Sequence, residues 1–123
     1  MDMIILDTNA VIYYLQNDKK AVQTIDKIRK KENLGISTIT EIEIFSFPNL
    51  TEIQQLSITK WLEEITIFPV DSFLSRQAAR LRRIYKIKTP DAIIASTAIF
   101  YNAKLITRDK DFKKIKELDI LAC

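Results

Sequence analysis

Histidine is absent from the chain, and its 123 residues include only one cysteine and one glycine. Without histidine, the Ser-His-Asp and Cys-His mechanisms and histidine acid–base catalysis are excluded. The single cysteine, Cys123, cannot form an internal disulfide or a usual structural zinc site. Because Gly35 is the only glycine, a P-loop or a glycine-rich dinucleotide loop cannot be present. Catalysis would depend on carboxylate, hydroxyl, lysine or arginine groups.

The chain also lacks a long hydrophobic run. No stretch approaches the roughly 18 apolar residues of a membrane-spanning helix. Residues 1–4 lack the basic region and cleavage site of a signal peptide. Hydrophobic residues make up 47% of the chain and charged residues 28%, which is typical of a globular protein with a core. We therefore expect one cytoplasmic domain, residues 1–123, with no membrane segment.

Short apolar runs alternate with longer amphipathic stretches, which predicts an α/β fold. Strands are expected at 3–6, 34–38, 65–68 and 104–107, with an edge strand at 119–122. Helices are expected from 7–9 to 15, at 19–31, from 40 to before Pro48, and at 51–64, 72–86, 89–101 and 109–117. Such alternation predicts a parallel sheet covered on both faces. In such folds the ligand site lies at the carboxyl ends of the strands.

Three of the expected helices carry specific packing predictions. Helix 72–86 has one apolar stripe, made of Leu74, Ala78, Leu81 and Tyr85. The helix that begins near Pro90 is apolar nearly all round, so we expect it to be buried. In helix 51–64 the expected core anchors are Ile53, Leu56 and Trp61.

Acidic residues follow the predicted strands or open the buried helix. They are Asp7, Glu41, Glu43, Asp91, Asp109 and Asp111. Because these positions converge on one edge of a parallel sheet, the carboxylates would repel one another unless a cation or protons neutralised them. Carboxylates without nitrogen or sulfur ligands suit hard cations such as Mg²⁺ or Mn²⁺. The sequence therefore predicts a divalent metal site at this edge.

Each acid also has a purely structural interpretation. Asp7 is a good helix N-cap, and Thr40 with Glu43 forms the pattern of a capping box. Asp91 would complement a helix dipole. For Asp111 we favour a place in the opening turn of a solvated helix. The functional interpretation depends on the coincidence that four separate segments deliver acids to one edge.

Four blocks resemble the signature blocks of PIN-domain ribonucleases: ILDTN at 5–9, STITEIE at 37–43, PDAIIA at 90–95 and LITRDKDF at 105–112. The closest group is the VapC-like toxins of prokaryotic toxin–antitoxin pairs. The resemblance covers residues 3–112. It implies a three-layer α/β/α domain with a central parallel sheet of four to five strands. It also implies Mg²⁺- or Mn²⁺-dependent RNA cleavage and a homodimer silenced by a protein antitoxin.

The resemblance assigns the catalytic and metal-binding acids to Asp7, Glu43, Asp91 and Asp109. Asp7, Asp91 and Asp109 would bind one metal directly. Glu43 would complete the site by direct ligation, through water or by positioning a second metal. The supporting polar residues are Thr8, Asn9, Thr40, Thr107 and Asp111. Two assignments stay open: Glu41 forms a second T-x-x-E pattern with Thr38, and Asp111 could share or take the role of Asp109.

The expected reaction is hydrolysis of RNA phosphodiesters by metal-activated water. Three alternatives remain: a housekeeping RNA-processing nuclease without an antitoxin, a non-catalytic RNA- or partner-binding module, and a receiver-like signalling domain with Asp71 as phosphoacceptor. Metal binding would argue against the second, and phosphorylation by a small phosphodonor would favour the third.

The net charge is only +3, so the distribution of basic residues matters more than their number. Arg76, Arg80 and Arg83 recur at i, i+4 and i+7, which places them on one helix face. We expect RNA contacts from this face, from Lys88 and from Arg108. A solvated surface, or a surface for an acidic antitoxin tail, would give the same pattern.

Overall fold

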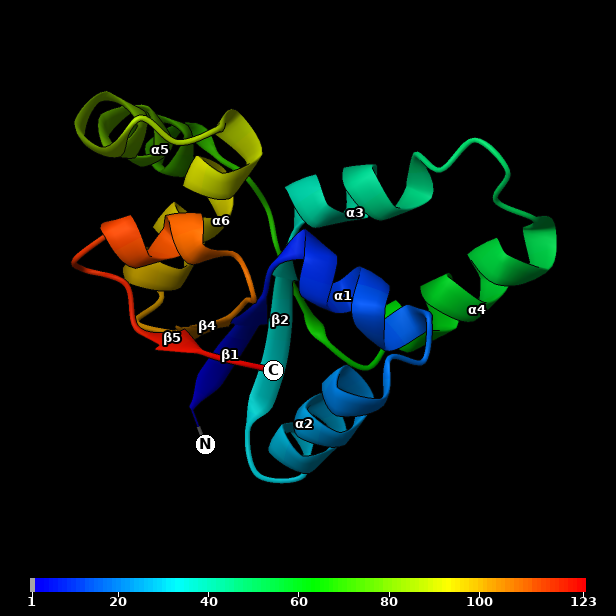
Figure 1. Cartoon of the computed structure of the whole chain (residues 1–123). Coiled ribbons are helices and arrows are strands. Elements are labelled where there is room, and N and C mark those ends of the chain that lie inside the picture. Colours follow the sequence, from blue (N-terminus) through cyan, green and yellow to red (C-terminus); the bar gives the residue numbers. More distant parts are fainter. Residues whose placement is uncertain (1) are drawn as a thin grey trace.

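Five parallel strands form the central sheet of the protein (Figure 1). The structure is a computed structural model that describes residues 2–123. The strands are β1 (Met3–Leu6), β2 (Asn33–Ser37), β3 (Thr66–Phe68), β4 (Lys104–Ile106) and β5 (Ile120–Leu121). Their order is β3-β2-β1-β4-β5, and every neighbouring pair is parallel. The predicted parallel sheet of four to five strands is confirmed, and β1 lies at its centre.

Helices cover both faces of this sheet, which confirms the three-layer α/β/α fold (Figure 1). The helices on one face are α1 (Thr8–Leu15), α2 (Lys19–Arg29), α3 (Thr38–Phe45) and α4 (Glu52–Leu62). Those on the other are α5 (Ser72–Tyr85), α6 (Thr89–Phe100) and the 3₁₀ helix η1 (Lys110–Lys114). Within residues 2–123, none of the helices combines the length and apolar character that crossing a bilayer requires.

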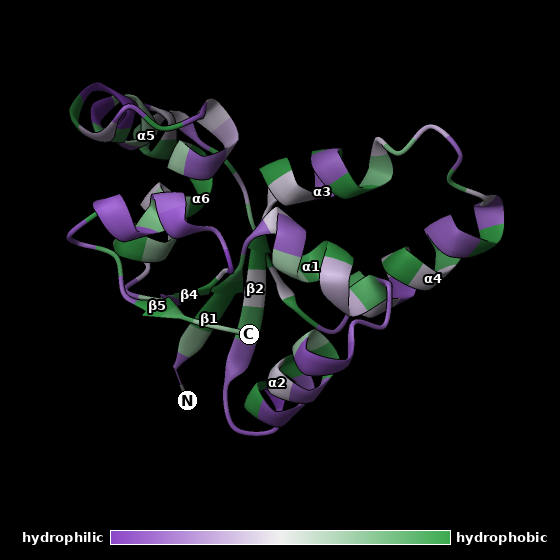
Figure 2. Ribbon diagram, viewed as in Figure 1, coloured by the Kyte–Doolittle hydropathy of each residue, from purple (hydrophilic) through white to green (hydrophobic). Residues whose placement is uncertain are grey.

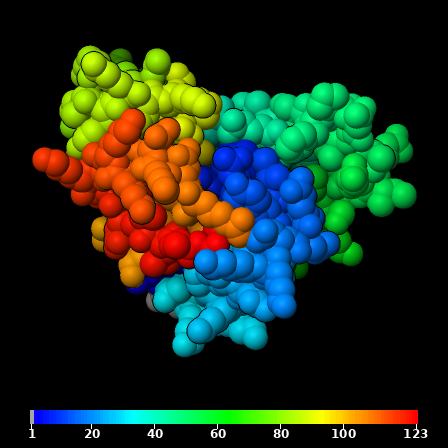
Figure 3. Space-filling view, in the orientation of Figure 1, coloured from blue at the N-terminus to red at the C-terminus, as the bar shows by residue number. Residues whose placement is uncertain are grey.

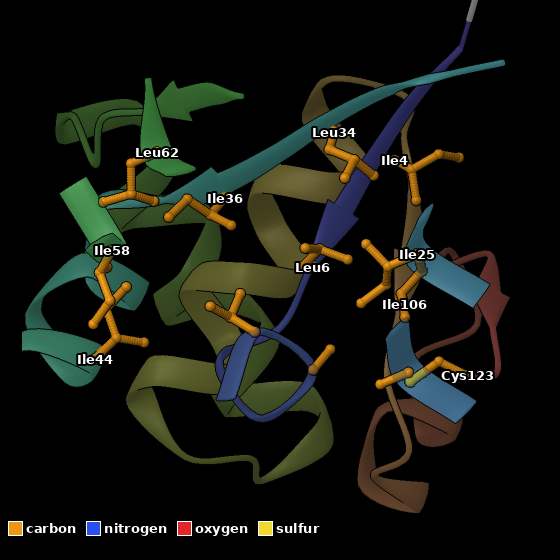
Figure 4. Packing of buried hydrophobic residues seen from close by; sticks show 13 residues of the cluster. Ile4, Leu6, Ile25, Leu34, Ile36, Ile44, Ile58, Leu62, Ile106 and Cys123 are labelled. Carbon is orange, nitrogen blue, oxygen red and sulfur yellow. The ribbon is translucent and has the colours of Figure 1, made fainter. Parts of the chain in front are cut away.

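The core is divided by the sheet, because successive side chains of a strand point to opposite faces. In β1, Ile4 and Leu6 pack under α1–α4, whereas Ile5 packs under α5 and α6. Figure 4 shows Leu6 and Ile106 of adjacent strands beside Ile25 of α2. In Figure 2 the strands are mainly hydrophobic, and hydrophilic residues alternate with hydrophobic ones along α2 and α5.

Gly35, in the middle of β2, allows the aromatic ring of Phe68 to approach the sheet closely. A Cβ at this position would lie 2.6 Å from Cε2 of Phe68 and 3.2 Å from the carbonyl oxygen of Thr66. A real Cβ never makes so short a contact, so the ring would have to move. The only glycine of the chain is therefore used for packing on the α5–α6 face.

The helix predictions are confirmed in part. Six residues of α6 are buried, as its apolar sequence predicted. On α5 the buried residues are Leu74, Ala78 and Leu81, which are three of the four members of the predicted stripe. The expected helix 109–117 is wrong in type and length, because only Lys110–Lys114 is helical and it is 3₁₀.

The predicted anchors of α4 are largely wrong. Ile53 and Leu56 are 80% and 70% exposed, and the buried residues of the helix are Ile58 and Leu62. Trp61 is partly buried and stacks on Tyr14 with ring centroids 5.4 Å apart. The apolar residues of α4 occupy two faces, and the sequence pattern alone does not tell which face meets the sheet.

Candidate functional site

Asp7 lies where the central strand ends, between the strand ends of β2 and β4. This is a switch point of an open α/β sheet, where ligand sites form. The side chain is only 3% exposed. Its Oδ1 accepts a hydrogen bond from the backbone N–H of Ala10 at 2.7 Å, so Asp7 caps α1 as predicted. Its Oδ2 accepts a hydrogen bond from the hydroxyl of Thr107 at 2.5 Å, which joins it to the end of β4.

Burial raises the pKa of Asp7, and the charges of Asp109 and Glu43 raise it further. The hydrogen bonds from Thr107 and Ala10 lower it in part. Asp7 is therefore a buried carboxyl group within electrostatic reach of two other acids.

Thr8 joins the start of α1 to the side of α3. Its hydroxyl donates a hydrogen bond to Oε1 of Glu43 at 2.5 Å and lies 3.1 Å from the hydroxyl of Thr40. Thr40 itself is fully buried. The chain thus brings Asp7 and Thr8 together with Thr40 and Glu43, which lie more than 30 residues further along the sequence.

The capping box predicted for Thr40 and Glu43 is wrong. The helix begins earlier, at Thr38, and its N-cap is Ser37, whose hydroxyl accepts from the backbone N–H of Ile39 at 3.2 Å. Thr40 and Glu43 therefore lie within the helix, free of capping, and both interact with Thr8. Ser37 at the end of a buried strand was the available signal for this earlier start.

Glu41 and Glu43 occupy different sides of α3, because two helical positions are about 200° apart around the axis. The side that carries Glu43 faces Thr8. The charge of Glu43 raises the pKa of both Asp7 and Asp91. The geometry thus groups Glu43 with the other acids.

Asp91 is in the first turn of α6 and is partly buried. The pKa of this carboxyl is raised to about 6, mainly by burial. The charges of three neighbouring acids contribute to the increase: Asp109, Asp7 and Glu43. Lys88, the N-cap residue of the same helix, opposes it. Asp91 therefore lies within electrostatic reach of the other three predicted acids.

Thr107 connects two of these acids. Its hydroxyl donates to Asp7 and accepts from the backbone N–H of Asp109 at 2.9 Å. The Oδ1 of Asp109 accepts from the N–H of Asp111 at 2.9 Å and caps η1. Asp111 is exposed and lies 3.8 Å from Nζ of Lys114. Asp109 thus faces the acidic cluster, and Asp111 lies in the opening turn of a solvated helix.

The remaining predicted site residues are exposed or partly exposed. Asn9 and Lys88 are exposed, and so are Arg76 and Arg83 on α5. Arg80 forms an ion pair with Glu117 at 3.4 Å. Figure 3 shows the first residues of α1 reaching the surface where α3, the α5–α6 turn and η1 meet.

The acidic cluster has no cationic side chain bound to it. The salt bridges of residues 2–123 join Arg29 to Glu64, Arg80 to Glu117, Arg108 to Asp18 and Lys114 to Asp111. None of them involves Asp7, Glu43, Asp91 or Asp109. In the same residues, no three potential ligands are arranged as a preformed metal site. The hydrogen bonds to Glu43 and Asp109 each engage one carboxylate oxygen, Oε1 and Oδ1, so the second oxygen of each group can serve a cation.

The donor set nevertheless fits a hard divalent cation. It consists of four carboxylates with neighbouring threonine hydroxyls, and it contains no histidine or cysteine. Oxygen ligands of this kind are the ones that Mg²⁺ and Mn²⁺ prefer. A cation would also relieve the repulsion that raises the pKa values of Asp7 and Asp91.

Solved structures of toxin–antitoxin proteins are similar to this chain. A toxin–antitoxin complex from Klebsiella pneumoniae matches with a TM-score of 0.83 and 28% identity over 96% of this chain and 95% of that chain. VapBC-1 from nontypeable Haemophilus influenzae matches with a TM-score of 0.80 and 25% identity, over 98% and 97%. VapBC2 from Rickettsia felis, bound to a promoter DNA fragment, shares the fold with a TM-score of 0.84 at 23% identity, over 98% of both chains.

A comparison with curated proteins gives no match. The family model described as the PIN domain matches residues 4–118, which is nearly the whole chain. The matched segment includes strands β2, β3 and β4, all of β1 except Met3, and all four acids of the cluster. The chain belongs to the PIN domain family.

Proposed function

We propose that the chain is a metal-dependent endoribonuclease formed by one domain, residues 1–123, and that it acts as the toxin of a toxin–antitoxin pair. The observation that carries the proposal is the meeting of four carboxylates from four separate segments, none of which is ion-paired with a cationic side chain of residues 2–123. Such an arrangement is costly for a purely structural cluster. It suits a site that binds a divalent cation together with a phosphate group.

Asp7, Asp91 and Asp109 would hold Mg²⁺ or Mn²⁺, and Glu43 would complete the site. The bound cation would lower the pKa of a water molecule and stabilise negative charge on the scissile phosphate. Thr107 would keep the carboxylate of Asp7 directed at the site, and Thr8 would restrain Glu43. Because the chain has no histidine, protons would leave through water and carboxylates.

Cleavage of a mixed-sequence single-stranded RNA tests this proposal. The purified chain should cleave it with Mn²⁺ or Mg²⁺ and stop cleaving when EDTA is added. The Asp7→Asn variant controls for a contaminating nuclease and should be inactive with Mn²⁺. Cleavage that persists in EDTA, or that the variant retains, would contradict the proposal.

An antitoxin is the proposed protein partner. The similar structures include toxin–antitoxin complexes. On this chain, α1, α3 and α4 enclose an apolar groove of about 400 Å³. Large hydrophobic side chains remain exposed on α3, on α4 and between them: Ile42, Phe47, Ile53 and Leu56. Phe47 also lines the groove, and an apolar groove with exposed hydrophobic side chains is typical of a surface that a protein partner covers. The homodimer that the family resemblance implies is also part of the proposal.

The partner can be tested with the short reading frame expected next to this gene. Co-expression of its product should yield a complex in which RNA cleavage is suppressed. The double variant Ile53→Ser/Leu56→Ser should release the partner, whereas Ile84→Ser, at an exposed position on α5, should retain it. If no such frame exists and the chain cleaves RNA alone, a housekeeping nuclease is the better description.

A further inference from the structure

Arg108 lies between Thr107 and Asp109 in the sequence, but its side chain points away from the acidic cluster. Its neighbours Thr107 and Asp109 are joined through the Thr107 hydroxyl, next to Asp7. The Arg108 side chain extends to the opposite side of this segment, toward the turn between α1 and α2. The sequence predicts that Arg108 contacts RNA, but the structure gives its guanidinium three partners within the chain.

These partners come from three different segments. A terminal nitrogen of Arg108 is ion-paired with Asp18, the N-cap residue of α2. The Nε donates a hydrogen bond to the carbonyl oxygen of Cys123 at 3.0 Å. The guanidinium lies 4.2 Å from the ring centroid of Tyr13, on α1.

The planar guanidinium is suited to this combination of contacts. It presents several N–H donors in a rigid fork and also packs on aromatic faces, which lysine does not do equally well. Because Arg108 is held on one side of the strand end, the backbone of residues 107–109 has a fixed position relative to α1. Asp7 caps that same helix, so both Asp7 and the segment 107–109 are held in place by contacts with α1.

We propose that Arg108 is a positioning residue, which holds residues 107–109 so that the hydroxyl of Thr107 and the carboxylate of Asp109 face Asp7. The proposal rests on the proposed function only where it concerns metal binding. It assigns Arg108 an indirect role in the site and removes it from the set of residues that would contact RNA phosphates.

The test compares Arg108→Ala with Arg29→Ala in the full chain. Arg29 is a matched control, because it also pairs with a carboxylate, Glu64, and contacts an α1 tyrosine, Tyr14. The exposed fractions of the two arginine side chains are similar, 33% and 30%. Arg29, however, ends α2 and precedes β2, so it lies toward the amino ends of the strands. Both variants should lose comparable stability, but only Arg108→Ala should disturb the site.

The first measurement is hydrogen exchange of backbone amides without metal. The Asp109 amide, which donates to the Thr107 hydroxyl, should exchange about 10-fold faster in Arg108→Ala than in the wild type and be unchanged in Arg29→Ala. Should Arg108→Ala fail to fold, Asp18→Asn provides a milder change, because asparagine is an equally good N-cap but lacks the charge. The Asp109 amide should also exchange faster in this variant.

The second measurement is Mn²⁺ affinity by calorimetry. Loss of a residue that orients metal ligands typically weakens binding by about 10–100-fold, and we expect this for Arg108→Ala but not for Arg29→Ala. Arg108→Lys should rescue only a small part of the affinity, because it restores the charge but not the fork.

A third measurement separates positioning from phosphate contact. RNA affinity in EDTA should depend on salt with the same slope in Arg108→Ala as in the wild type. An unchanged Asp109 amide together with a slope flattened by about 0.7 would overturn the proposal and return Arg108 to the RNA surface. If the wild type bound no Mn²⁺ at all, the proposed function would fail, and amide exchange would still decide whether Arg108 positions this segment.

Discussion

The burial of Asp7 has an energetic cost, because a carboxylate removed from water without a cation loses most of its hydration energy. Two hydrogen bonds compensate in part, one from Ala10 and one from Thr107. The pKa of Asp7 is nevertheless raised. A residue kept in this state is poorly explained by capping alone, since an exposed aspartate would cap α1 equally well. Its cost is understandable if the site binds a cation.

Neutralising one member of the cluster should therefore stabilise the protein when no metal is bound. Asp91→Asn is the cleanest change, because no hydrogen bond to this side chain would be lost. Its melting temperature in EDTA at pH 7 should exceed that of the wild type. Excess Mn²⁺ should raise the melting temperature of the wild type more than that of the variant. A melting temperature below the wild type in EDTA would argue against mutual repulsion in the cluster.

The pKa of Asp91 also predicts a dependence of stability on pH. The folded pKa of about 6 lies above the ordinary aspartate pKa of 3.8, so the folded state holds the proton more tightly than the unfolded state. The contribution of this group to stability is complete at low pH and declines as the pH rises from about 4 to about 6. In EDTA, urea unfolding across this range should show a decline that Asp91→Asn lacks. Equal slopes in both proteins would mean that the carboxyl titrates normally.

Glu43 and Glu41 can be separated by matched substitutions. The structure places Glu43 against Thr8 and near Asp7 and Asp91. A metal ion supplies several kcal/mol of transition-state stabilisation, so Glu43→Gln should lower the rate of RNA cleavage by about 100-fold or more. Glu41→Gln should retain nearly the full rate, and the assay is cleavage with saturating Mn²⁺. The opposite result would assign the second acid to Glu41.

The positions of the acids could be predicted from the sequence because each follows a strand or opens a helix. Their hydrogen bonds could not be predicted in the same way. The bond from Thr107 to Asp7 spans 100 residues and exists because β4 pairs with β1. Likewise, the contacts of Thr8 with Thr40 and Glu43 depend on how α3 lies beside α1. Such contacts follow from strand order and helix packing, which short sequence patterns do not contain.

At the scale of elements, the shortage of glycine means that other residue types adopt the left-handed conformation at helix ends. Within residues 2–123, three residues that are not glycine adopt a left-handed backbone with positive φ: Asn17 at 62°, Lys86 at 54° and Asn102 at 52°. Asparagine tolerates this conformation comparatively well, whereas lysine does not. Lys86 is the C-cap of α5, and its N–H donates to the carbonyl oxygen of Arg82. The turn that leads from α5 to the start of α6 is thus a point of backbone strain.

Replacing Lys86 with glycine should relieve this strain. The left-handed conformation costs a non-glycine residue about 1–2 kcal/mol, and the greater entropy of unfolded glycine offsets about half of that gain. We expect Lys86→Gly to gain roughly 0.5–1 kcal/mol in chemical denaturation. Lys86→Ala removes the same charge but keeps the strain, so it should bring no gain. Equal stabilisation by both variants would attribute the effect to charge.

The elements differ in how well the sequence predicts them. The helix α6 is apolar nearly all round and six of its residues are buried, so its place in the core was predictable. In α4, by contrast, Ile53 and Leu56 lie on one face and Ile58 and Leu62 on another. Only packing against the rest of the fold selects the second face for the core. The other face, with Ile53 and Leu56, remains exposed.

At the scale of the whole molecule, the parallel sheet followed from the alternation of strands and helices, but its order did not. The order places β1 between β2 and β4 and so brings Asp7, Glu43 and Asp109 together. Charge is also distributed unevenly over the molecule. The cluster of acids lies near the exposed Lys88, and α5 carries exposed arginines. We therefore expect RNA to be held beside an acidic site by cations on neighbouring surfaces.

The basic face of α5 is smaller than the sequence suggested, because Arg80 is paired with Glu117. Arg76 and Arg83 remain exposed. If both contact phosphates of single-stranded RNA, the double variant Arg76→Ala/Arg83→Ala should flatten the log–log salt dependence of binding by about 1.4, or about 0.7 for each contact. Binding is measured in EDTA, which prevents cleavage, with the similarly exposed Lys60 of α4 changed to alanine as a control. An unchanged slope would make this face a solubility feature.

The central claim is that four carboxylates at the carboxyl ends of the strands bind a divalent cation. The most direct test is the anomalous diffraction of Mn²⁺ in crystals of the wild type and of Asp7→Asn. We predict a peak within about 2.0–2.3 Å of carboxylate oxygens from Asp7 and from Asp91 or Asp109, with Glu43 bound directly or through water, and no peak in the variant. A wild-type crystal with saturating Mn²⁺ but no peak there, or a peak that persists in Asp7→Asn, would contradict the claim.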